Sequence, residues 1–193
     1  MSYFPLLVVL PNHIAQKDDF EQYVYIVNVL EKYNESVECS SYVVMSKDKL
    51  RSEFEENKDD YESMEEFCKK WYGCTLDEDG NAVSTFNKDS LFSAWRIGGK
   101  FNKQIKESID DFIIVEEDTE SHNYKPIYTI NDNSVPIDMF LSKLNQWNHH
   151  IVDHNGTLHK YIDEIPSDQW NGMMLSILGD CENGLVVLIE CEF

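Results

Sequence analysis

The most apolar stretches of this chain lie near its two ends. Leu6–Pro11 reads LLVVLP, an apolar run closed by proline, and residues 184–193 read GLVVLIECEF. Continuous apolar runs of this length are typical of strands that are buried on both faces. We therefore expect residues 5–10 and 185–192 to be strands inside the same sheet.

Two segments between these ends carry apolar residues at helical spacing. Residues 17–36 open with an acidic turn, and residues 47–73 are a long, charged region with an expected break near 57–60 and a helix stop at Gly73. The apolar stripe of the first segment comprises Phe20, Tyr23, Val24, Val27 and Leu30. The stripe of the second comprises Leu50, Phe54, Tyr61, Met64, Phe67, Cys68 and Trp71. Each stripe predicts a helix that packs on a core through that face.

The remaining segments predict shorter strands and turns. Residues 37–46 and 111–118 predict strands, because both are rich in β-branched or aromatic residues. Asp79-Gly80 marks a hairpin turn. Asn155-Gly156 marks a second one, of type I′, within a hairpin over 150–161.

Two more helices are expected in the C-terminal half. Residues 137–147 predict a short helix or an extended edge, and residues 167–180 predict a helix with Ser167 or Asp168 as N-cap. The alternation of strands and helices predicts an α+β fold, a single domain over 1–193 with a mixed or antiparallel sheet and helices packed on one face. The acidic helical region at about 47–72 is its most insertion-like part.

Charge narrows the classes of partner. The chain has 36 acidic and 16 basic residues, a net charge of −20. Phosphate binding draws most of its energy from Lys and Arg, so general affinity for nucleic acid or anionic membranes is excluded. A basic host protein fits, with an acidic face at Glu53, Glu55, Glu56, Asp59 and Asp60. The alternative is that the charge only keeps the protein soluble.

Other features place the protein in the cytoplasm and give it no cofactor. The opening YFPLLVVL lacks the basic start and cleavage site of a signal peptide, and no apolar run approaches the ~20 residues of a membrane span. The five cysteines form no C-x-x-C pair, which indicates reduced thiols and no zinc site. We expect no metal, and whether the chain forms a homo-oligomer is left open.

Residues 86–101, FNKDSLFSAWRIGGKF, contain the candidate ligand site. Gly98-Gly99 permits positive φ and leaves two backbone N–H groups unobstructed. Arg96 supplies a donor fork, Lys100 a point charge, and Trp95 a stacking surface. These groups predict a cradle for an anion or nucleotide. The alternative is a strand–turn–strand in which Arg96 pairs with an acid while Trp95, Ile97 and Phe101 pack inward.

The histidines offer a second candidate. His149, His150, His154 and His159 flank Asp153, but the expected hairpin does not give the helical spacing that a metal site would need. His159 is the candidate for acid–base chemistry, and the sequence indicates no nucleophile for it. The chemistry leans against an enzyme without excluding one.

Four segments together resemble a family of uncharacterised proteins from bacteriophages and bacterial mobile regions. They are YFPLLVVLP, NKDSLFSAWRIGGKF, DHNGTLHKY and GLVVLIECEF. The central one resembles the family signature N-P-D-S-K-W-D-W-Y-x-I-G-G-R-W. The positions that fit are Asn87, Ser90, Trp95, Arg96, Ile97, Gly98 and Gly99. The departures include Lys88 for Pro, Ser93 for an acid, Lys100 for Arg, Phe101 for Trp and Glu192 for a C-terminal His.

The resemblance implies a phage setting, in the host bacterial cytoplasm, and action against a host defence process. It implies no reaction. Three function classes follow: a non-enzymatic binding protein that holds an anionic or nucleotide-like ligand at Trp95–Lys100, an acidic inhibitor that mimics nucleic acid on a basic host protein, and a small enzyme using His159. The ligand-binding residues of the first class are Asn87, Ser90, Trp95, Arg96, Gly98, Gly99, Lys100 and His159.

Overall fold

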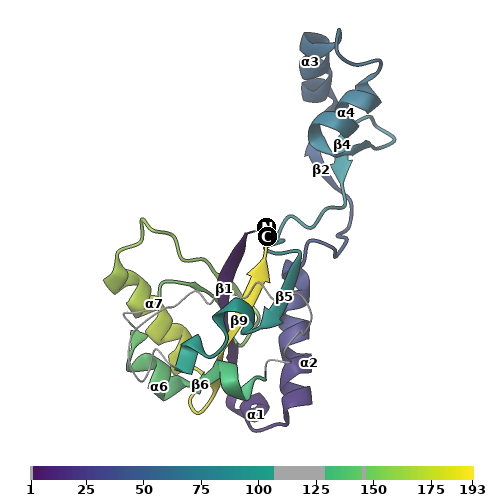
Figure 1. Cartoon of the computed structure of the whole chain (residues 1–193). Coiled ribbons are helices and arrows are strands. Elements are labelled where there is room, and N and C mark those ends of the chain that lie inside the picture. The colour runs from purple at the N-terminus through teal and green to yellow at the C-terminus, as the bar shows by residue number, and fades with distance from the viewer. Residues whose placement is uncertain (1, 107–128, 145–146) are drawn as a thin grey trace. The chain divides into compact units, whose positions relative to one another are not determined.

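The structure is a computed structural model that describes residues 2–106, 129–144 and 147–193 (Figure 1). The strand expected at 111–118 lies outside the described residues. Contacts divide the chain into two compact units: Met1–Asn34 with Leu91–Phe193, called the first unit below, and Glu35–Ser90, called the second unit. The insertion-like region expected at about 47–72 lies within the second unit.

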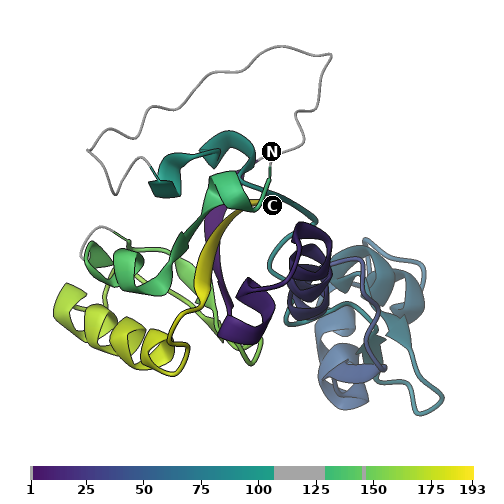
Figure 2. The same ribbon diagram turned by 90° about the horizontal axis from the view of Figure 1, so that it is seen from below.

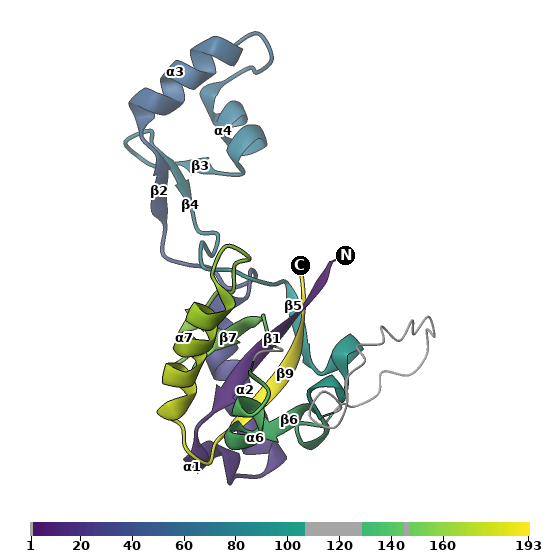
Figure 3. The ribbon, with the colours of Figure 1, turned by 90° about the vertical axis from the view of Figure 1, so that its left-hand side faces the viewer.

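The first unit is built on a mixed sheet in the order β5-β9-β1-β7-β8, with β6 also paired to β9. The two apolar segments near the chain ends are β1 and β9, which lie side by side and antiparallel over their whole length (Figures 1 and 3). β7 runs parallel to β1. The α+β class and the mixed sheet are thereby confirmed. The strands are β1 Tyr3–Leu10, β5 Ala94–Ile97, β6 Ser134–Pro136, β7 His150–Val152, β8 Leu158–His159 and β9 Leu185–Glu192.

Helices cover both faces of this sheet, whereas we expected them on one (Figure 2). Leu7 and Val9 pack with α6 and α7 on one face, while Leu6, Val8 and Leu10 pack with α2 on the other. Successive side chains of a strand point to opposite faces, so a continuous apolar run requires a cover on each. The helices are α1 Asn12–Ala15, α2 Asp19–Leu30, α6 Ile137–Leu141 and α7 Ser167–Gly179, with 3₁₀ turns at Glu31–Tyr33, Gly99–Phe101 (η2) and Asn131–Asn133 (η3).

α2 buries a different face from the one that the apolar stripe predicted. Its buried residues are Gln22, Ile26 and Leu30, whereas Phe20 is exposed. The helix is apolar around much of its circumference, so periodicity alone does not select a face. Gln22 favours the observed one, because its amide donates hydrogen bonds to the carbonyls of Ala15 and Lys17 in the preceding turn.

The second unit has its own small core beneath a three-stranded sheet, β2-β4-β3. Two helices pack on it, and the expected break between them is confirmed (Figure 3). Gly73 ends the second helix with a φ of +65°, as the sequence predicted. The elements are β2 Tyr42–Met45, α3 Lys47–Asn57, α4 Met64–Tyr72, β3 Thr75–Leu76 and β4 Ala82–Ser84. The buried residues are Leu50, Phe67, Cys68, Cys74 and Ala82.

Two local predictions are corrected. α7 begins after Pro166 without a side-chain cap, so neither Ser167 nor Asp168 is its N-cap. The hairpin over 150–161 exists, but Asn155 does not have the positive φ that a type I′ turn requires. Its loop is held instead by the Asp153 carboxylate, which accepts the N–H groups of Asn155 and Thr157. Among the described residues, no helix combines the length and the apolar composition of a membrane span.

Candidate functional site

The segment with the predicted cradle is β5 and the turn after it. β5 pairs antiparallel with β9, and this register places Arg96 opposite Glu190. Arg96 Nε lies 2.8 Å from Glu190 Oε1, and Arg96 Nη2 lies 3.9 Å from Glu192 Oε2. Glu190 is only 1% exposed. A carboxylate this deeply buried requires a charged or hydrogen-bonding partner, and Arg96 supplies one.

The Gly-Gly turn folds around the same carboxylate. Gly98 and Gly99 have φ values of +66° and +57°, which side-chain-bearing residues rarely adopt. The N–H of Lys100 donates to Glu190 Oε2. A Cβ on Gly99 would lie 2.6 Å from Glu190 Cδ, and a Cβ on Gly98 would overlap the amide of Asn133. The space above both glycines is therefore filled by side chains of the protein.

Arg96 and the Lys100 N–H group, which were expected beside a ligand anion, instead bind the carboxylate of Glu190. The Lys100 ammonium lies 4.0 Å from the centroid of the Tyr3 ring, a cation–π contact. Ile97 is buried, and Trp95 and Phe101 pack against the two cores. The observed geometry is the strand–turn–strand alternative, so the ligand prediction for Trp95–Lys100 gains no support from it.

The other residues of that prediction lie elsewhere. Asn87 and Ser90 belong to the second unit. Asn87 is buried, and its side-chain oxygen accepts from the N–H of Asp89 and from the Cys39 thiol. The N–H of Ser90 donates to the Asn87 carbonyl. Both residues therefore build a local turn.

His159 lies on β8, at the opposite edge of the sheet from β5. Four strand spacings separate these edges, about 19 Å at ~4.8 Å per spacing. His159 and Arg96 therefore cannot belong to one small-ligand site, and the single site predicted for them is corrected.

His159 forms a pair with the Asp153 carboxylate, with 2.9 Å between Nε2 and Oδ2. Desolvation acts to raise the pKa of Asp153. The hydrogen bonds from His159 and from the amides of Thr157 and Asn155 outweigh it and hold that pKa below its usual value. Among the described residues no hydroxyl or thiol is hydrogen-bonded to His159. The pair fixes the hairpin, and the enzyme alternative gains no nucleophile from the fold.

The neighbouring histidines have structural partners. His150 accepts the N–H of Tyr161 through Nδ1. Burial, and next the adjacent His150, lower the pKa of His149 to about 4, so His149 is neutral near pH 7. No cluster of three His, Cys, Asp or Glu residues suited to a metal ion occurs in residues 2–106, 129–144 or 147–193.

The acidic residues expected to face a partner lie at the end of α3 and in the turn after it. Between residues 53 and 66 there are eight acids and one lysine. Glu53 accepts the Tyr72 hydroxyl, and Glu55 lies 3.4 Å from Lys58. Glu56, Asp59 and Asp60 are exposed and form no ion pair with any described residue. This face of the second unit, residues 53–66, is called the acidic face below.

An exposed tryptophan lies beside the acidic face. Trp71 was expected in the core of the second unit, but it is 59% exposed. Phe67 and Cys68 are the buried residues of the nine-residue α4, and Trp71 stacks on the Phe67 ring. Its ring also meets the edge of Tyr61, with 6.5 Å between centroids. Tyr61 is flanked in sequence by Asp60 and Glu62, so Trp71 borders the acidic face.

Comparison with protein-family models, with curated proteins and with solved structures gives no match for this chain. The resemblance to phage proteins therefore stays a prediction that rests on the quoted segments.

Proposed function

We propose that this protein is a non-enzymatic, acidic binding protein that docks its second unit on a basic surface of a partner protein. The observation that carries the proposal is the position of Trp71, an exposed aromatic beside exposed acids that lack ion pairs. Tryptophan is among the residues that most often dominate the free energy of protein–protein binding.

Charge complementarity supports this assignment. The acidic face holds eight acids and one lysine. The acids repel one another, and this repulsion lowers the stability of the free protein. A basic partner removes the repulsion and accelerates association by electrostatic steering. The Trp71 ring adds apolar contact area that charges alone do not provide.

The partner chemistry is that of a surface which binds nucleic-acid phosphates. Such surfaces are rich in Lys and Arg, and carboxylates on the acidic face compete for the same cations. The resemblance to phage proteins adds the setting to this proposal: inhibition of a host defence protein in the bacterial cytoplasm.

The test is capture from bacterial lysate on the immobilised full-length protein. The matched pair reverses five acids to Lys either in the acidic face or in the first unit. The first set is Glu53, Glu55, Glu56, Asp59 and Asp60, and the control set is Glu31, Asp163, Glu164, Asp180 and Glu182. Both variants raise the net charge equally, so a difference in capture between them reports the docking face and not the overall charge.

We expect a captured protein to be released by sheared double-stranded DNA and by salt, since exposed charges are screened within about 8 Å at physiological ionic strength. Capture should be lost with the acidic-face variant and with Trp71→Ala, and kept with the control variant. Capture that persists in the acidic-face variant, or that DNA does not release, contradicts the proposal.

A further inference from the structure

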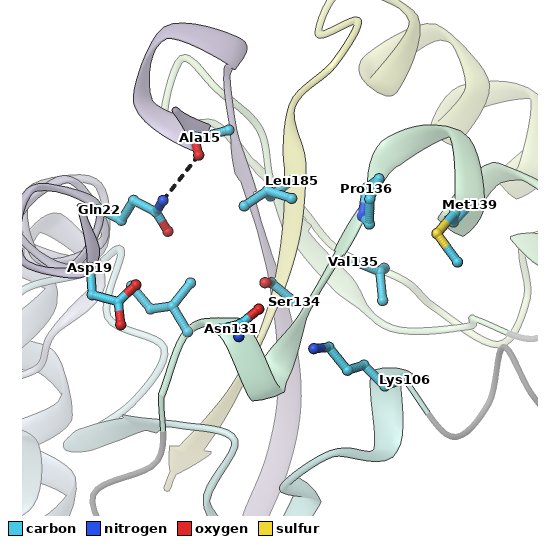
Figure 4. Close-up of a pocket in the computed structure, with 11 residues that line it drawn as sticks. Ala15, Asp19, Gln22, Lys106, Asn131, Ser134, Val135, Pro136, Met139 and Leu185 are labelled. Atoms are coloured by element: carbon cyan, nitrogen blue, oxygen red, sulfur yellow. Dashed lines mark hydrogen bonds between the residues drawn. The ribbon is translucent and has the colours of Figure 1, made fainter. Parts of the chain in front are cut away.

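The first unit contains a cavity of about 620 Å³ that none of the predicted sites includes (Figure 4). Its walls come from α2 on one side and from η3, β6 and α6 on the other. Volumes of about 300–1,000 Å³ are typical of small-molecule sites. The apolar part of the wall includes Val135 and Leu185.

One polar side chain on the α2 side is held in a fixed orientation. Gln22 is 6% exposed, and its Nε2 donates to the carbonyls of Ala15 and Lys17, at 3.0 and 2.8 Å. These two bonds set the orientation of the amide, so Oε1 points into the cavity (Figure 4). Oε1 accepts no hydrogen bond from any described residue. Oε1 is therefore free to bond to solvent or to a ligand in the cavity.

The opposite wall of the cavity also carries polar side chains that form no hydrogen bond with a described residue. Ser134 is buried, and although its backbone pairs with Val187 in the sheet, its hydroxyl has no hydrogen bond within the described part of the chain. The side-chain amide of the exposed Asn131, next to it on the wall, has no hydrogen bond to a described residue either. Three polar side chains, from α2, η3 and β6, thus line one cavity with hydrogen-bonding capacity that no described residue uses.

Opposite charges stand on the two walls. Asp19 projects from the first turn of α2, and Lys106 approaches from the side of Asn131 and Ser134 (Figure 4). Neither forms an ion pair with a described residue. The α2 wall therefore offers acceptors, the Asp19 carboxylate and Gln22 Oε1, and the opposite wall offers the Lys106 ammonium.

We propose that this cavity binds a small zwitterion with separated charges. Its ammonium group contacts Asp19 and Gln22, its carboxylate contacts Lys106, and its apolar side chains lie against Val135 and Leu185. A dipeptide has this chemistry, because its two charged ends are roughly 7 Å apart when it is extended. Its peptide group can also exchange hydrogen bonds with Ser134 and Asn131. The site lies in the first unit and does not depend on the proposed docking of the second.

The probe is leucyl-leucine, measured by titration calorimetry and by the rise in melting temperature of the full-length protein. Two derivatives each remove one charge: N-acetyl-leucyl-leucine and leucyl-leucine amide. We expect each derivative to bind about ten- to a hundredfold more weakly, the usual effect of losing one charge-assisted contact.

Two variants assign the ends of the ligand. Asp19→Asn should weaken binding of leucyl-leucine about tenfold and leave binding of the N-acetyl derivative unchanged. Lys106→Met should weaken leucyl-leucine equally and leave the amide unchanged. Asp138→Asn and Lys143→Met, which lie outside the cavity, are the controls and should bind like the parent protein.

The melting temperature of each variant without ligand shows that it is folded. Absence of leucyl-leucine binding at millimolar concentration overturns the proposal, as does binding that both variants leave intact. Binding of inorganic phosphate alone, lost in Lys106→Met and indifferent to Asp19→Asn, also overturns it, because it would define an anion site.

Discussion

Arg96 and Glu190 face each other across β5 and β9, and the 2.8 Å contact between Nε and Oε1 joins a half-exposed cation to a buried carboxylate. The Lys100 amide completes the environment of Glu190. Arg96 therefore stabilises the protein's own sheet.

Arg96→Ala should lower the free energy of unfolding by about 2 kcal/mol, because it leaves a buried charge without its cation. The effect stays below that of a fully buried pair, since the Arg96 side chain is 47% exposed and partly solvated. Arg96→Lys should lie between Ala and the parent. Urea denaturation at pH 7 measures the three proteins. An unchanged midpoint for Arg96→Ala would contradict this stabilising role of the ion pair.

Gly98→Ala should destabilise the first unit more than Gly73→Ala destabilises the second. Both glycines have nearly the same positive φ, +66° and +65°. A Cβ at Gly73 meets nothing within 4 Å, whereas one at Gly98 meets the Asn133 amide. The strain at Gly73 costs roughly 1 kcal/mol, and the clash at Gly98 adds to it. Thermal unfolding compares the two, and equal losses would place the Asn133 side chain elsewhere.

His149 should make the first unit less stable in weak acid. Its pKa in the folded protein is about 4, below the ordinary value of 6.5, so the unfolded chain binds the proton more readily. The loss begins as the pH falls below about 6.5 and is complete near pH 4, at about 3 kcal/mol. His149→Gln should remove this part of the pH dependence, and the exposed His13→Gln should not. If the free energies of unfolding of His149→Gln and the parent change in parallel between pH 4 and 6.5, this role of His149 is contradicted.

Asp153→Asn should cost about 1 kcal/mol at neutral pH, because it removes the charge-assisted bond to His159 and keeps an oxygen for the Asn155 and Thr157 amides. The pKa of Asp153 is lowered, so this contribution is present above the unfolded pKa of about 4 and disappears as the pH falls through the lower folded value. Chemical denaturation at pH 7 and pH 3 tests this pH dependence. The difference in free energy of unfolding between Asp153→Asn and the parent should be smaller at pH 3.

Trp71→Ala should change the stability of the second unit by less than about 1 kcal/mol, because the side chain is mostly solvated. Phe67→Ala, at a buried ring in the same helix, should cost about 3–5 kcal/mol. The two free energies of unfolding separate an anchor for a partner from a core residue. A large loss in free energy of unfolding for Trp71→Ala would show that Trp71 is a core residue.

Patterns that depend on a single segment could be read from the sequence. The apolar runs of β1 and β9 leave few alternatives to central strands, and Gly73 ends α4 because its left-handed φ disfavours other residues. α2 shows the limit of this reasoning. Its apolar residues support more than one stripe, and the tertiary neighbour that selects a face is not visible along the helix.

The candidate sites depend on the pairing of distant strands, which no single segment of the sequence specifies. A partner acid for Arg96 could be anticipated, but Glu190 becomes that partner only through the pairing of β5 with β9, 94 residues later in the chain. The cavity likewise combines Gln22, Lys106 and Ser134, which lie far apart in sequence. Trp71 is exposed although it lies on the apolar stripe of its helix, because helical spacing predicts the position of a stripe and not its width.

The pairing of β1 with β9 also sets the order in which the protein can fold. β9 contacts β1, β5 and β6, so a ribosome must complete residue 192 before the central sheet of the first unit can close. Long loops must be ordered before these distant pairings contribute free energy, which slows folding. The core of the second unit uses residues 45–82 alone, so it can fold while the rest is still being translated. The nascent chain therefore presents the acidic face before the sheet and its cavity exist.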